Sequence, residues 1–311
     1  HINCNLVVAH NPLISRGSKR LNSKNSVERA VIFAIKNDIA IYAIHTNLDN
    51  VLDGVNSKIA EKLQLQNCQV LLPKKETLQK LVTFSPEKNA IDVRNALFKA
   101  GAGAIGKYDE CSFNVKGEGT FRAGEGSHPY VGKQGELHVE EEIRIEVIFP
   151  TLIHNQLIRA LKEAHPYEEV AYYIQQLENV RNDIGSGLTG ELQEPLSENQ
   201  LLELLKDQFH LSVIKHTAFL NKPVKKIAVC GGAGIFLLPD AIAAGADVFI
   251  TGDVKYHEFF DADGRLLLAD IGHFESEQFT IELLTEFLQE KYRHFAVLKT
   301  EINTNPVNYF T

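Results

Sequence analysis

Long apolar runs and closely spaced cysteines are both missing from this sequence of 311 residues. No stretch of about 18 consecutive apolar residues occurs, so no membrane-spanning helix is expected. The four cysteines are widely scattered and never form a CxxC pair. This spacing excludes a disulfide framework and a thiolate zinc site. No signal peptide is recognisable either, and we therefore expect a protein of the reducing cytoplasm.

Methionine is also absent, although a chain of this length would ordinarily contain several, and the first residue is His1. We therefore expect the native translation start to lie upstream of His1.

The charge balance is moderately acidic, with a net charge of −8 and a pI near 5.9. This balance argues against a broad nucleic-acid-binding face, although a local basic groove would be compatible with it. Hydrophobic residues make up 44% and charged residues 23%, which is typical of a globular protein. A chain of this length forms two domains, or one domain with a large insertion.

The first part of the chain alternates predicted strands with predicted helices. Residues 3–10 and 38–45 are apolar runs typical of buried strands, and residues 27–38 and 48–65 have the periodicity of amphipathic helices. Such alternation predicts a parallel sheet with helices on its faces. The same pattern resumes later, with predicted strands at 225–234, 246–253, 265–272 and 295–302 and predicted helices at 236–245 and 276–294.

The segment between these two α/β regions has a different character. Residues 81–113 and 144–174 each run strand, helix, strand, with helical segments at corresponding positions. Two βαβ copies in tandem predict a ferredoxin-like α+β sandwich. Residues 116–136, rich in glycine and charge, predict an exposed loop between the copies.

These patterns together predict an α/β fold class with two domains. We expect residues 1–76 and 179–311 to form a discontinuous α/β domain with a mostly parallel sheet and internal pseudo-twofold symmetry. Residues 77–178 would form the inserted α+β domain.

A histidine and an acid four residues later follow a predicted strand twice in the chain. His45 and Asp49 follow the second strand, and His273 and Glu277 follow a strand of the later α/β region. Positions four apart lie on one face of a helix, about 6 Å from each other. Because ligands bind at the carboxyl ends of strands in open parallel sheets, the two pairs predict one shared site.

A further histidine follows the neighbouring strand in each half, His10 in the first and His257 in the second. Imidazole and carboxylate donors suit Zn, Fe, Mn or Co better than Ca or Mg. A carboxylate that bridges two ions about 3.5–4 Å apart is a common design in hydrolases. The pattern therefore predicts a metal site with mixed nitrogen and oxygen donors.

Simpler interpretations also fit single motifs. A lone HxxxD at a helix start is typical of capping, for which Thr46 and Asp49 are suitable residues. The turn CGGAG at 230–234 could hold a phosphate, but it lacks the P-loop lysine and the dinucleotide spacing, which favours a tight turn. HPYEEVAYY at 165–173 is interpreted as structural. No GxSxG elbow supports Ser-His-Asp catalysis.

In combination, these motifs resemble those of the GTP cyclohydrolase 1 type 2 homolog family, also called the NGG-interacting-factor-three-like family. The resemblance covers essentially the whole chain and is carried by AHNPLI (9–14), IHTNLD (44–49), TGDVKYHE (251–258) and DIGHFESE (270–277). The insertion is similar to the PII/CutA-like domain of the longer bacterial members. The resemblance also implies a further strand and helix ahead of His1.

The resemblance implies a dinuclear site for two divalent ions, with Glu277 as the bridge. The positions that match the family's metal ligands are His10, Asp49, His273 and Glu277. The family's second histidine falls on Asn11, and an amide is a poorer ligand than imidazole for a transition metal. One ion is therefore expected to bind weakly or to use water instead.

His45 and His257 are not ligands in the family, and we expect them to orient ligands or to transfer protons. The resemblance further implies a toroidal homohexamer, with a small-molecule ligand as a possible partner. Neither nucleic acid nor a membrane is an expected partner.

Two functions fit these observations. The first is a metal-dependent hydrolase of a nucleotide-like or phosphoester substrate. The second is a non-enzymatic regulatory or scaffold ring protein, in which the metals are structural and the insertion senses a ligand. A DNA-binding ring is disfavoured by the charge balance.

Overall fold

The structure is a computed structural model that describes residues 4–14, 17 and 20–310. Residue 3 of the predicted first strand lies outside the described residues. In the part of the chain that is described, no helix is long and apolar enough to cross a membrane.

The chain divides into two compact units. The first consists of residues 1–73 and 182–311, and the second of residues 74–181. The predicted insertion, residues 77–178, falls within the second unit. Each unit has its own hydrophobic core.

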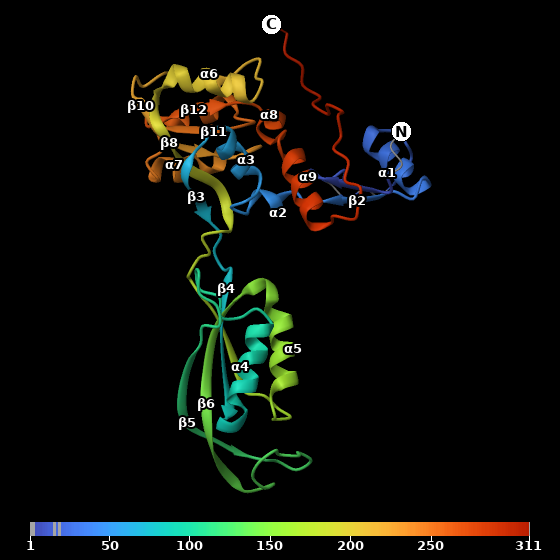
Figure 1. The fold of residues 1–311 in the computed structure, drawn as a ribbon, viewed down its shortest axis with the longest axis vertical. Coiled ribbons are helices and arrows are strands. Elements are labelled where there is room, and N and C mark those ends of the chain that lie inside the picture. The colour runs from blue at the N-terminus through green and yellow to red at the C-terminus, as the bar shows by residue number, and fades with distance from the viewer. Residues whose placement is uncertain (1–3, 15–16, 18–19, 311) are drawn as a thin grey trace. The chain divides into compact units, whose positions relative to one another are not determined.

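The first unit contains a small parallel sheet formed by β1 (Leu6–Ala9) and β2 (Ala40–Ala43). The connection between these strands includes α1 (Ser26–Lys36), which begins where the side chain of Asn25 accepts a hydrogen bond from the Glu28 amide at 2.8 Å. This order confirms the predicted strand–helix–strand pattern. Among the described residues, these two strands pair with each other alone and form a sheet separate from the larger one (Figure 1).

The larger sheet of this unit has six strands in the order β3-β8-β10-β11-β12-β9. The central strands β10, β11 and β12 pair in parallel, whereas β3, β8 and β9 join antiparallel. The predicted parallel pairing therefore holds at the centre but not at the sides. The strand bounds are β3 (Gln66–Pro73), β8 (Gly185–Ser197), β9 (Lys215–His216), β10 (Pro223–Val229), β11 (Val248–Thr251) and β12 (Leu267–Asp270).

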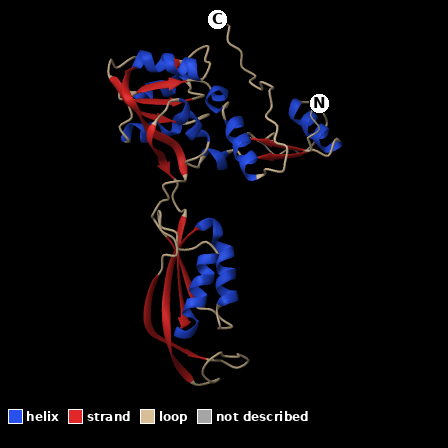
Figure 2. Cartoon of the chain, viewed as in Figure 1, coloured by secondary structure: helices blue, strands red, loops and turns tan. Residues whose placement is uncertain are grey.

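The central strands are apolar on both faces because helices cover both faces (Figure 2). On β11, Ile250 packs into one core together with Ile59 of α3 and Leu205 of α6, while Phe249 packs into another with Leu238 of α7. The remaining helices of this unit have the bounds α2 (Thr46–Asp49), α3 (Val55–Lys62), α6 (Glu198–Gln208), η3 (Ile235–Leu237), α7 (Leu238–Ala243), η4 (Tyr256–Ala262), α8 (His273–Glu277) and α9 (Thr280–Lys291).

Three sequence predictions in this unit are wrong. The predicted helix 48–65 is divided into α2 and α3, because the chain turns at Gly54 so closely that a Cβ there would collide with the carbonyl oxygen of Leu48. The predicted helix 276–294 is divided into α8 and α9. Residues 295–302 form no strand, and β9 takes the sheet edge beside β12 instead.

The second unit has the order βαββαβ and a four-stranded antiparallel sheet, β5-β6-β4-β7, which is the predicted ferredoxin-like topology. Its core joins alternate residues of β6 to α4 and α5 on one face of the sheet. Residues 116–122 belong to β5, so the predicted loop is shorter than expected. The element bounds are β4 (Leu78–Pro86), η1 (Glu87–Asn89), α4 (Ala90–Lys99), β5 (Phe113–Arg122), β6 (Leu137–Pro150), η2 (Thr151–Ile153), α5 (His154–Ala164) and β7 (Tyr172–Gln176).

A buried histidine makes the stability of the second unit depend on pH. His165 accepts a hydrogen bond at Nδ1 from the Tyr167 amide at 3.1 Å, so Nε2 carries the proton and donates to the Phe84 carbonyl at 2.7 Å. Burial lowers the pKa of His165. The unfolded chain, with a histidine pKa of about 6.5, therefore binds a proton that the folded unit resists.

We expect this contribution to the free energy of unfolding to be complete above about pH 6.5 and to be lost as the pH falls below that value. Calorimetric unfolding of the full chain on both sides of this pH would measure it. His165→Gln should unfold more easily at neutral pH but lose this part of the pH dependence. An identical pH dependence in both proteins would contradict the assignment to His165.

Candidate metal centre

The carboxylate of Glu277, at the end of α8, is the point at which distant parts of the first unit meet. Its Oε2 atom lies 3.4 Å from Nε2 of His10 and 3.4 Å from Nε2 of His273. The same oxygen accepts a hydrogen bond from Nδ2 of Asn11 at 3.3 Å. Residues from the end of β1 and from the end of β12 therefore share one carboxylate.

His10 and Asp49 complete the more buried side of this cluster. Nε2 of His10 lies 3.3 Å from Oδ1 of Asp49, which ends α2. Among the described residues, His10, Asp49 and Glu277 offer ligand atoms that all lie within 4.8 Å of one another. Both ring nitrogens of His10 are buried and have no hydrogen-bond partner in the described structure. Nε2 nevertheless lies at ion-pair distance from both carboxylates, so a cation held between the three groups would contact all of them.

His273 is oriented by an acid that the sequence analysis did not single out. Nδ1 of His273 donates to Oδ2 of Asp253 at 2.7 Å, which leaves Nε2 free to face Glu277. A carboxylate that fixes the tautomer of a ligating histidine is common at metal sites. Asp253 lies just beyond the end of the central strand β11, so its place at a parallel strand end was the available signal.

The two histidines expected to assist the ligands lie in different surroundings. His45 contacts His10 edge-on, with ring centroids 5.8 Å apart. Its backbone has a φ of +40°, which an L residue rarely adopts and which costs on the order of 1–3 kcal/mol. His257 is exposed in η4 and contacts the ring of Tyr256. It is not part of the cluster of described residues around Glu277.

The glycine turn after β10, residues 230–234, is hydrogen-bonded to residues that lie next to the candidate ligands. The buried Asn56 donates from Nδ2 to the Asp49 carbonyl at 3.1 Å, and its Oδ1 accepts from the Gly231 amide at 2.9 Å. Oγ of the buried Ser276 accepts from the Gly232 amide at 2.8 Å. These amides already have partners, so the turn is a tight connection and not a cradle for phosphate.

The carboxylates and imidazoles of the cluster shift one another's pKa values. Burial raises the pKa of Asp49, although His10 opposes this effect. Burial alone would also raise the pKa of Glu277, but the imidazoles of His10 and His273 lower it to about 2. The contact with Glu277 raises the pKa of His273 to about 9. Burial raises the pKa of the nearby Cys230 thiol to about 12.

The donors present fit a divalent transition metal. The cluster supplies two imidazoles and two carboxylates, the mixed set preferred by Zn, Fe, Mn and Co. Glu277 remains ionised beside the two imidazoles, so its carboxylate is available as an oxygen donor. Sequence reasoning identified all four donors, and the structure brings His10, Asp49 and Glu277 together, with His273 next to Glu277.

Comparison with known families gives a match along nearly the whole chain. The family described as Duf34/NIF3 (NGG1p interacting factor 3) matches residues 1–306. The chain belongs to this family. It is 38% identical over 310 residues to the GTP cyclohydrolase 1 type 2 homolog of Halalkalibacterium halodurans and 35% identical over 309 residues to that of Bacillus subtilis. Each alignment covers 98% of this chain and 83% of the relative.

Two solved structures have a fold similar to that of this chain. The crystal structure of a Bacillus cereus protein related to NIF3 matches with a TM-score of 0.84 and 38% identity, over 98% of this chain and 83% of that one. A Staphylococcus aureus protein matches with a TM-score of 0.76 and 26% identity, over 98% and 82% of the two chains. The family resemblance predicted from four sequence motifs is therefore confirmed.

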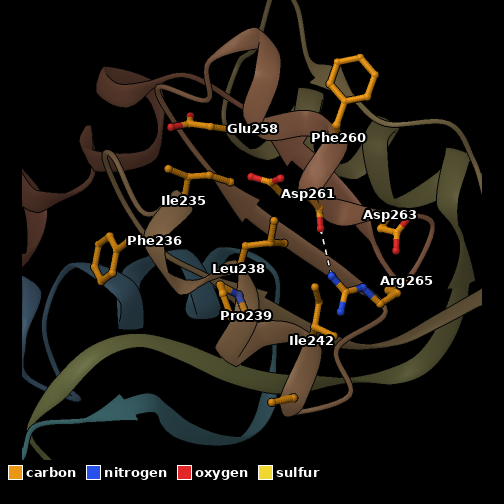
Figure 3. Close-up of a pocket in the computed structure, with 11 residues that line it drawn as sticks. Ile235, Phe236, Leu238, Pro239, Ile242, Glu258, Phe260, Asp261, Asp263 and Arg265 are labelled. Carbon is orange, nitrogen blue, oxygen red and sulfur yellow. Dashed lines mark hydrogen bonds between the residues drawn. The ribbon is translucent and has the colours of Figure 1, made fainter.

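A separate hollow of about 840 Å³ lies between α7 and η4 (Figure 3). Its floor is apolar, with Leu238 and Ile242, and its edge carries Glu258 and Asp261. Arg265 donates to the Asp261 carbonyl at 3.2 Å at this edge. The hollow contains none of the candidate ligands, and its chemistry is that of an apolar surface with an acidic edge.

A matched pair of glycine substitutions tests whether the turn and the cluster are coupled. Gly232 has a φ of +65°, and a Cβ there would collide with Oε1 of Glu277 and approach Nε2 of His273 to 3.3 Å. Gly245 has a φ of +70°, but a Cβ there would meet nothing within 4 Å.

We expect both alanine variants to lose about 1–2 kcal/mol of stability from the left-handed backbone. Only Gly232→Ala should also lose metal, because it displaces the ligands. Thermal unfolding together with elemental analysis of the purified proteins measures both effects. Equal metal content in the two variants would show that the turn does not support the site.

Proposed function

We propose that this Duf34/NIF3 protein binds two divalent ions and hydrolyses a nucleotide-like or phosphoester substrate. The ions would be Zn, Fe, Mn or Co, and the residues that would hold them are His10, Asp49, His273 and Glu277. The observation that supports the proposal is the convergence of His10, Asp49 and Glu277, whose ligand atoms all lie within 4.8 Å of one another.

The chemistry follows from where the donors lie. Divalent ions held there would polarise the bond to be cleaved and lower the pKa of a water molecule towards neutrality. Asp253 would keep the proton of His273 on Nδ1, so that Nε2 presents its lone pair to the site. His273 is 42% exposed in its side chain and His10 only 10%, so a substrate would approach from the side of His273.

The substrate class rests on the relatives. The curated relatives are called GTP cyclohydrolase 1 type 2 homolog, which supports a nucleotide-like substrate. Hydrolysis of a phosphoester would use the same ions in the same way. We therefore propose a screen of both classes.

Removal of a proposed ligand should remove metal and activity together. We expect Asp49→Ala and Glu277→Ala to lose bound metal, measured by elemental analysis, and to lose turnover in a screen of nucleotides and phosphoesters with added Mn²⁺ or Zn²⁺. Glu290→Ala is the control, because Glu290 is an exposed acid at the end of α9. It should retain both properties.

Unchanged metal content in Asp49→Ala and Glu277→Ala would contradict the assignment of the site. Loss of metal in a protein that turns over no substrate in the screen would favour the second candidate function, a regulatory or scaffold protein with structural metals. The observation that favours this second function is Asn11, which offers an amide beside Glu277 in place of a stronger donor.

We also propose that the protein acts as a homo-oligomer, a hexamer by analogy with the family. Support comes from apolar side chains exposed on the small sheet and on α1, where Leu6, Phe33, Ile35 and Tyr42 are each more than half exposed. Light scattering of the protein at micromolar concentration should therefore give a mass well above the 34.7 kDa of one chain. A monomer under these conditions would contradict the proposal.

A further inference from the structure

A buried carboxylate in the second unit has no cation beside it. Glu142 of β6 is only 9% exposed. Its Oε1 atom accepts a hydrogen bond from the hydroxyl of Tyr167 at 2.9 Å. Its Oε2 atom has no hydrogen-bond or ion-pair partner among the residues that the structure describes. A carboxylate withdrawn from water in this way is costly unless a cation or further N–H donors contact it.

Aromatic rings lie next to this carboxylate. The ring of Tyr167 lies 6.1 Å from that of Phe121 on β5 and 6.2 Å from that of Tyr130, as measured between ring centroids. Phe121 in turn lies 5.3 Å from the ring of His138. Burial and the carboxylate of Glu142 raise the pKa of Tyr167, so its phenol keeps the proton that it donates. The faces of such rings attract cations.

Two glycines of β5 leave room on the same face of the sheet. The strand register places Gly117 opposite Glu142 and Gly119 opposite Glu140, and opposed residues share one face. A Cβ on Gly119 would collide with Oε2 of Glu142, so the carboxylate lies over this glycine. A Cβ on Gly117 would meet nothing within 4 Å. Open space therefore adjoins the carboxylate, on the face to which alternation also assigns Phe121.

The basic groups nearby have other partners than Glu142. His138 lies 2.9 Å from Oε2 of Glu140, measured from Nε2. Nζ of Lys88 lies over the ring of Tyr130, 4.7 Å from its centroid, and no ion pair joins it to Glu142 in the described part of the chain. One ammonium group of the protein itself is thus already placed on a ring of this cluster, while the buried carboxylate is left without one.

The geometry suits an organic cation better than a metal ion. Within the described residues, three mutually close metal-ligand atoms occur at the cluster around Glu277 and not around Glu142. We propose that the second unit binds the primary ammonium group of a small organic molecule, which donates an N–H to Oε2 of Glu142 and places its charge beside the rings of Tyr167 and Phe121. HPYEEVAYY (165–173), which the sequence analysis interpreted as structural, supplies Tyr167 to this site.

The probe for this site is propylammonium, titrated into the full chain at neutral pH and followed by saturation-transfer NMR of its methyl protons. 1-Propanol has the same length without the charge and should show no binding. Tetramethylammonium has the charge but no N–H, and it should bind about ten-fold more weakly, because it cannot donate to the carboxylate.

Three variants locate the binding. Glu142→Gln keeps the shape of the side chain and an oxygen for the hydroxyl of Tyr167, and it should weaken propylammonium binding about ten-fold or more. Gly117→Leu should block binding, because its side chain fills the open space without a clash at its Cβ. Glu141→Gln is the matched control, since Glu141 is exposed and adjacent residues of a strand point to opposite faces. Circular dichroism confirms that each variant is folded.

Loss of binding in Glu142→Gln and Gly117→Leu, with binding retained in Glu141→Gln, would support the proposal. The absence of saturation transfer to propylammonium, or equal affinities in Glu142→Gln and the unaltered protein, would overturn it. Equal binding of 1-propanol or tetramethylammonium would overturn the ammonium contact with Glu142. All of these residues belong to the second unit, so none of these results bears on the proposed metal-binding function of the first.

Discussion

A carboxylate that remains charged in a half-enclosed position is the constraint on which the candidate site depends. Withdrawal of Glu277 from water would ordinarily favour its neutral form, because a buried charge is costly unless it is paired. Two imidazoles and an amide N–H converge on one of its oxygens and reverse that preference. His10 and Asn11 follow the end of β1, and His273 follows the end of β12. The ionised state of Glu277 therefore depends on where these two strands end.

The central parallel strands explain how such a convergence is built. β10 leads into the glycine turn, β11 into Asp253, and β12 through Gly272 into the short helix α8 that carries His273 and Glu277. Carboxyl ends of neighbouring parallel strands share one edge of a sheet, which places these connections together. The small sheet contributes in the same way, since β1 leads to His10 and β2 to the helix that ends at Asp49. Hydrophobic cores on both sheet faces keep the strand ends in register.

Much of this arrangement could be predicted from sequence, because local patterns encode it. Strand–helix alternation predicted the central parallel strands. The HxxxD and HxxxE pairs predicted Asp49 and Glu277, which belong to the cluster, and His273, which lies next to Glu277. Asp253 was missed because an acid after a strand is common and only the fold shows that it contacts His273. His257 lies in the same segment as Asp253, TGDVKYHE (251–258), and its imidazole could serve as a ligand, but it is exposed in η4. The wrong strand at 295–302 has an equally physical cause: an apolar pattern forms a strand only beside an available edge.

The connection between the two units has a consequence for how the chain is constructed. The second unit leaves the first after Pro73 and returns just ahead of Gly185, and these two residues pair directly across the antiparallel strands β3 and β8. In terms of chain path, the whole ferredoxin-like unit is therefore the tip of a β-hairpin. Loop-closure entropy rises only slowly with loop length, so a hairpin tolerates a tip of this size at small cost. A short turn in its place would join β3 to β8 along the same chain path, since every strand that leads to the candidate metal centre belongs to the first unit.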